Sequence, residues 1–121
     1  MSFGKVPVIV LAARADAATL VRAVLEDAQD IEIVALTPNV ADLVDLCARY
    51  QPSVLVVCTG TNPQTEVITK ICAENCESLA GMVIVDVADI GPGTDLSSLP
   101  HLVRRIGEHK RTGGQLAAYY F

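Results

Sequence analysis

The stretch Pro52-Ser53-Val54-Leu55-Val56-Val57-Cys58-Thr59-Gly60 decides the fold of this chain. Its apolar run, residues 54–58, is too short for a helix and is dominated by β-branched valine. A proline before the run and a glycine after it mark its two ends. The run therefore predicts a strand that is buried on both faces, as strands are in a parallel sheet.

Similar apolar runs recur along the chain and alternate with segments of helical periodicity. We expect strands at residues 6–13, 31–36, 54–58, 82–87 and 116–121. Helices are expected to follow the caps Asp16, Asn39 and Asn62 and to lie at about residues 98–110, where Leu102, Val103 and Ile106 form a weaker stripe. Residues 89–98 are rich in Gly, Pro, Ser and Asp and predict a loop. This alternation predicts βαβ units with right-handed crossovers.

Length and composition narrow the class of protein. The 121 residues predict one domain, 1–121, and a hydrophobic content of 51% with 19% charged residues excludes a disordered chain. The net charge of −5 and the lack of a basic cluster argue against nucleic-acid binding through this domain. No apolar stretch approaches the roughly 20 residues of a membrane span. Without a signal-peptide pattern, we expect a cytoplasmic protein whose four cysteines are free thiols.

Six segments match a known family in their order and spacing: Val8–Ala13, Leu20–Glu26, Asp30–Val34, Asn39–Tyr50, Gln51–Cys58 and Met82–Val85. Through them nearly the whole chain resembles the CheY-like receiver domain of two-component response regulators. The resemblance implies a flavodoxin-like, three-layer α/β/α fold whose five-stranded parallel sheet has the order 2-1-3-4-5. In this family a fifth helix covers the sheet beside the first, and here that helix is expected to be missing or to lie beyond Phe121.

The resemblance also implies where a phosphorylation site should lie. The family has an acidic pair after the first strand, a phospho-accepting aspartate ending the third, a hydroxyl ending the fourth and a lysine ending the fifth. The acidic pair falls on Ala12 and Ala13, the aspartate on Cys58 and the hydroxyl on Val87, with Asp86 beside it. The lysine would fall just beyond Phe121. We therefore expect a degenerate site with no bound metal, no cofactor and no enzymatic activity.

Two other interpretations concern the cysteines. Cys58 precedes an expected helix start at Asn62, so it could be an activated thiolate in a phosphocarrier or a redox sensor. We favour a packing role, because no basic residue flanks Cys58 in the sequence. Cys72 and Cys76 have metal-ligand spacing, but they share an apolar helix face and are expected in the core. A nucleotide or flavin binder has little support, because residues 12–15 contain no glycine.

The resulting hypothesis is a pseudo-receiver that acts as a protein-interaction or oligomerisation module in bacterial signal transduction. The resemblance places the interaction surface on the fourth helix, the fifth strand and the fifth helix, of which about residues 98–121 are present here. Its candidate residues here are His101, Arg104, Arg105, Tyr119, Tyr120 and Phe121. A missing fifth helix would leave an apolar face bare, so we expect a homo-oligomer, or a protein partner or output domain that follows in a longer chain.

Overall fold

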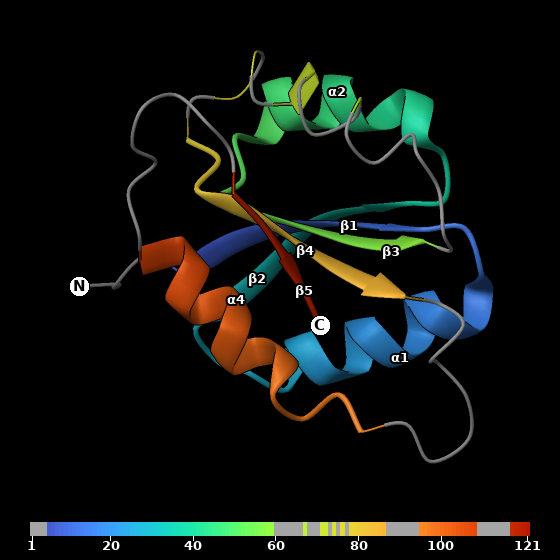
Figure 1. The fold of residues 1–121 in the computed structure, drawn as a ribbon, viewed down its shortest axis with the longest axis vertical. Helices are drawn as coiled ribbons and strands as arrows, with labels where there is room; N and C mark the ends of the chain where they lie inside the picture. The colour runs from blue at the N-terminus through green and yellow to red at the C-terminus, as the bar shows by residue number, and fades with distance from the viewer. Residues whose placement is uncertain are drawn as a thin grey trace.

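A five-stranded parallel sheet in the order β2-β1-β3-β4-β5 forms the centre of the molecule (Figure 1). The structure, a computed structural model, describes residues 5–59, 67, 71–72, 74, 76, 78–86, 95–108 and 117–121. Its elements are β1 (Val6–Ala12), α1 (Ala15–Glu26), β2 (Ile31–Thr37), α2 (Val40–Tyr50), β3 (Val54–Thr59), β4 (Gly81–Asp86), α4 (Leu99–Glu108) and β5 (Ala117–Tyr120). The predicted strand order and the three-layer α/β/α fold are confirmed.

Each face of the sheet supports its own apolar core. Alternate residues of a strand point to opposite faces, so Val54, Val56 and Cys58 join one cluster while Leu55 and Val57 join the other. The first cluster packs against α1 and α4, and the second packs against α2 and the buried thiols of the segment before β4. Because both faces of β3 are buried, the prediction made from its sequence is confirmed.

The position of α4 departs from the predicted hand of the crossovers. Across the sheet, the step from β1 to β2 runs towards one edge strand, and the step from β4 to β5 runs towards the opposite edge strand. Right-handed crossovers would then place α1 and α4 on opposite faces. Instead both helices pack into one cluster, and Figure 1 shows them on the same side of the sheet. The crossover through α4 is left-handed, so the prediction of uniformly right-handed crossovers is wrong.

Three features hold α4 beside α1. The first is its buried apolar stripe of Leu99, Val103 and Ile106. The predicted stripe is wrong at Leu102, whose side chain is only partly buried. Such a stripe contributes about 1.5–3 kcal/mol for each fully buried side chain. Gly107 lets α4 approach β1 closely, and Arg104 forms an ion pair with Asp30 in the turn between α1 and β2.

The position of α4 also bears on the expected association, which was predicted because a missing fifth helix would leave an apolar face bare. In a receiver domain the face beside the first helix is covered by the fifth helix. Here α4 covers that face, because it contributes three buried side chains to the same cluster as α1. The expected bare face beside the first helix is therefore wrong.

The helix starts agree with the predicted caps in part. Asn39 caps α2 as predicted, because its Oδ1 accepts a hydrogen bond from the Ala41 N–H at 3.1 Å. Asp16 does not cap α1: the capping position is Arg14, and Asp16 lies in the first turn. The expected helix start at Asn62 lies outside the described residues, although Val67, Cys72 and Glu74 have helical backbone. None of the helices described is long and apolar enough to cross a membrane.

Candidate functional site

The carboxyl ends of β1, β3 and β4 meet at one edge of the sheet, where the family places its phosphorylation site. Ala12 is the register partner of Cys58, and Cys58 is the register partner of Val85. Ala13 follows directly and is exposed. The structure thus brings Ala12 and Cys58 together, as the resemblance implies. Val87 lies outside the described residues, next to Asp86, the last residue of β4.

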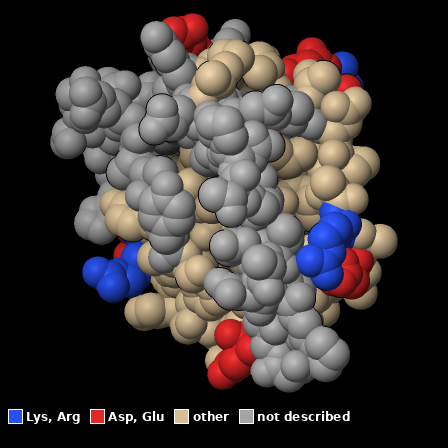
Figure 2. All heavy atoms as spheres, turned by 45° about the vertical axis from the view of Figure 1, so that its right-hand side comes forward, with Lys and Arg blue, Asp and Glu red and all other residues tan. Residues whose placement is uncertain are grey.

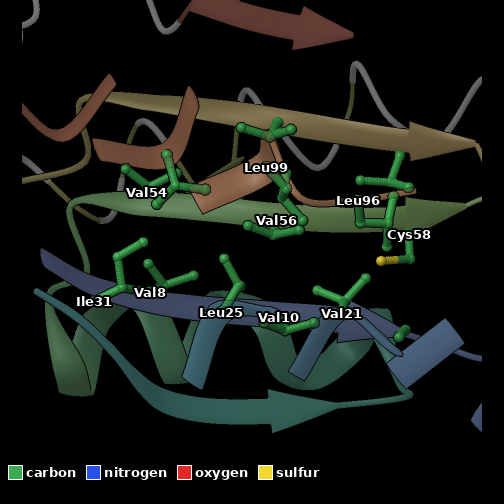
Figure 3. Close-up of a cluster of buried hydrophobic side chains, with 14 of the residues drawn as sticks. Val8, Val10, Val21, Leu25, Ile31, Val54, Val56, Cys58, Leu96 and Leu99 are labelled. Atoms are coloured by element: carbon green, nitrogen blue, oxygen red, sulfur yellow. The ribbon is translucent and has the colours of Figure 1, made fainter. Parts of the chain in front are cut away.

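The described side chains around Ala12 and Cys58 at this edge are apolar. Cys58 is 3% exposed and Ala12 is 2% exposed, and Ala17 of α1 belongs to the same cluster. The cluster also contains Leu96, whose side chain lies at the same end as Cys58 in Figure 3. Mg²⁺ needs hard oxygen ligands, and the described residues contain no group of three His, Cys, Asp or Glu side chains that could hold a metal.

Leu96 is the residue at this site that the sequence did not indicate. It lies in the segment predicted as a loop, where one apolar residue between polar neighbours carries no periodicity. The structure shows it 3% exposed, just before α4. The leucine itself, among polar neighbours, was the one signal in the sequence that this segment reaches the core. Its neighbours form a turn in which the Asp95 carboxylate accepts a hydrogen bond from the Ser97 N–H at 2.9 Å.

Burial raises the pKa of the Cys58 thiol to about 12. A thiol with this pKa is protonated at neutral pH, whereas a phosphocarrier or a redox sensor needs the thiolate. The environment of Cys58 therefore favours the packing role over the activated-thiolate interpretation.

Asp16 is an acidic residue close in sequence to this edge, in the first turn of α1. Its carboxylate accepts hydrogen bonds from Arg14 and the Ala17 N–H. The hydrogen bond from the guanidinium holds the pKa of Asp16 below its usual value. Both side chains are exposed, so the pair adds little stability. Asp16 is thus engaged by Arg14 in this structure.

The residues predicted to form an interaction surface differ in their exposure. His101 and Arg105 are exposed and lie one turn apart on α4, and Tyr119 of β5 is 39% exposed. Arg104 was predicted to face a partner, but its guanidinium is partly buried against Asp30. Phe121 is partly buried against the cluster of α1 and α4.

The last of these residues, Tyr120, belongs to β5, but its side chain lies outside the described residues. A further question is whether the described basic side chains gather in one place. Figure 2 shows that, on the described part of the face in view, the Lys and Arg side chains lie beside Asp or Glu.

Comparison with known proteins supports the fold of the chain. The chain is similar to the solved response regulator domain of Thermotoga maritima CheB, with a TM-score of 0.61 over 96% of this chain and 78% of that chain. The fold is that of a receiver domain. The sequence identity is 12%, so the similarity concerns the fold alone. No protein-family model matches the chain, and no curated protein matches its sequence.

Proposed function

We propose that this chain is a receiver-like, non-catalytic interaction module that does not accept a phosphoryl group. The observation that carries the proposal is the apolar pairing of Ala12 with Cys58 at the edge where phosphorylation would occur. Phosphoryl transfer needs a nucleophile and a cation that neutralises the developing charge. An alanine and a buried, protonated thiol supply neither.

Incubation with acetyl phosphate and Mg²⁺ tests the first half of the proposal. We expect the intact mass to stay unchanged while a receiver domain with its aspartate, treated in parallel, gains one phosphoryl group. A stoichiometric adduct on this chain would refute the proposal. If that adduct mapped to Cys58, the phosphocarrier interpretation would replace it.

The second half of the proposal concerns binding. We propose that His101 and Arg105 on α4, together with Tyr119 on β5, contact a protein partner, an output domain or a second copy of this chain. Their exposure and their place on one helix and one edge strand support this assignment. Arg104 is left out, because Asp30 engages it within the chain. We further propose a cytoplasmic location in bacterial signalling, where the four free thiols stay reduced.

Sedimentation velocity over a range of concentrations tests self-association through this surface. Self-association through this surface predicts a dimer whose dissociation constant rises at least tenfold in the double variant Arg105→Glu/Tyr119→Ser. The matched control is Arg22→Glu on α1, a residue that pairs with Glu26 on an exposed face. A monomer at all concentrations, or equal weakening by the control, would remove the homo-oligomer from the proposal and leave the partner or output domain.

A further inference from the structure

Helix α4 and the turn before it run along the α1 side of the sheet. Near the start of this segment, Leu96 lies at the same end of the cluster as Cys58 (Figure 3). The Leu99 N–H donates a hydrogen bond to the Leu96 carbonyl oxygen at 2.9 Å, which ties Leu96 to the first residue of the helix. Towards the other end, Gly107 packs against Val6, the first residue of β1. The segment therefore reaches from the carboxyl ends of the strands to their amino ends.

An ion pair holds the second half of α4 to the body of the domain. Arg104 contacts the Asp30 carboxylate through its Nε, an atom that is itself buried. Asp30 lies in the turn between α1 and β2, and its carbonyl oxygen accepts a hydrogen bond from the Val6 N–H at 2.8 Å. The side chains of Arg104 and Asp30 are 39% and 47% exposed, so dissolved salt reaches the pair. The strength of this contact therefore depends on ionic strength.

The remaining contact between α4 and the sheet is narrow. The helix has ten residues, of which Leu99, Val103 and Ile106 are buried. A helix of this length is not stable alone in water, so α4 depends on its packing for its structure. Its left-handed crossover also lacks the general preference that favours right-handed connections. Because the pairing of the five strands does not involve α4, the helix can separate from the sheet while the strands stay paired.

We propose that α4 and Leu96 form a strap that opens from the α1 side of the sheet as one unit, with the ion pair of Arg104 and Asp30 as its salt-sensitive latch. Opening takes Leu96 out of the cluster and uncovers Cys58. The strap gives the domain a second, open conformation, and it operates whether or not a partner binds the outer surface of α4.

The four cysteines report an opening separately for each face of the sheet. Cys58 lies in the cluster that α4 covers, whereas Cys47, Cys72 and Cys76 lie in the cluster on the α2 side. All four are free thiols, and none is more than 3% exposed. A thiol reagent can therefore reach each of them only after an opening. The cysteine that reacts first shows which face of the sheet has opened.

The test labels the full chain with iodoacetamide and measures the labelling rate of each cysteine by mass spectrometry. Cleavage after Arg49 and Lys70 places Cys58 on a peptide without any other cysteine. Each rate is divided by that of the same thiol in the urea-unfolded chain at the same salt concentration. We expect Cys58 to react first, at a rate that rises with NaCl concentration. Equal rates at all four cysteines, a first reaction on the α2 side, or a Cys58 rate independent of salt would each overturn the proposal.

Asp30→Asn removes the charge of the latch and keeps the shape of the side chain. Because the buried Nε of Arg104 then lacks an anionic partner, we expect the Cys58 rate to rise by more than about fivefold, the most that an exposed ion pair contributes. The matched control is Glu26→Gln, which removes one charge from the exposed pair with Arg22 on α1. A rise no larger than in the control, or an equal rise at all four cysteines, would refute the latch. The rates in the parent chain decide the question even if Asp30→Asn does not fold.

Discussion

Replacing Cys58 by aspartate introduces the acceptor residue of receiver domains and tests how apolar the surroundings of position 58 are. Cys58 is 3% exposed in a cluster of aliphatic side chains. Burying a carboxylic acid there without a hydrogen-bond partner costs about 1–3 kcal/mol even when it is neutral. The buried carboxyl group should also have a pKa raised by about 3–5 units. We therefore expect Cys58→Asp to be destabilised strongly, and increasingly so as the pH rises.

The pH dependence follows from the direction of the pKa shift. A folded-state pKa above the unfolded value of about 3.9 means that the folded chain binds more protons than the unfolded chain. Stability therefore falls as the pH rises from about 3.9 towards the folded-state pKa. If that value is near 7, ionisation in the unfolded state adds about 4 kcal/mol to the cost at pH 7. The total of about 5–7 kcal/mol is comparable with the whole stability of many domains.

Urea unfolding of Cys58→Asp at several pH values between about 4 and 7 measures this cost. Cys58→Asn is the matched control, because its side chain has nearly the same shape but does not titrate. The difference in unfolding free energy between the two variants should grow by about 1.4 kcal/mol per pH unit. A Cys58→Asp variant within about 1 kcal/mol of the control at every pH would refute the burial argument. It would then show that this edge can hold a carboxylate.

Three further predictions concern stability and use unfolding free energies as the measurement. In Gly107→Ala the new Cβ would lie 2.8 Å from Val6 Cγ1, so the clash should cancel or exceed the helix-propensity gain of about 1 kcal/mol. In a Val6→Ala background the same change should stabilise, and equal effects in both backgrounds would contradict the close approach. Asn39→Ala should cost about 1 kcal/mol, with Asn39→Asp retaining the cap. Burial raises the pKa of Cys58 to about 12, so the contribution of its thiol to folding stability falls as the pH rises from about 8.5 to about 12. Over that range the parent chain should lose stability relative to Cys58→Ala. Parallel plots of unfolding free energy against pH for the two chains would contradict this prediction.

Much of the sheet could be predicted because each strand carries its own local signal. Val54 to Cys58 is buried on both faces of its strand. Asn39 marks the start of α2 by a hydrogen bond to its side chain from Ala41, only two residues away. The strand order came instead from the resemblance, because hydrophobic pattern alone does not say which strands are neighbours. The apolar nature of the phosphorylation edge was predictable in the same way, since Ala12 and Cys58 replace residues with known roles in the family.

The hand of the crossover through α4 could not be predicted from local pattern. A buried stripe of Leu99, Val103 and Ile106 fits either face of the sheet. The features that select the α1 side depend on pairs far apart in sequence, such as Arg104 with Asp30. The general preference for right-handed crossovers pointed to the other face. Here specific contacts outweigh that preference.

The burial of Leu96 links the surroundings of Cys58 to the position of α4. Leu96 is buried in the cluster that contains Cys58 and Ala12, and it lies three residues before α4 begins. Because Leu96 lies on the α1 side of the sheet, the chain enters α4 on that same side. An aspartate at position 58 would make this environment unfavourable for a leucine. Leu96 therefore anchors the start of α4 beside Cys58, on the face of the sheet that α1 covers.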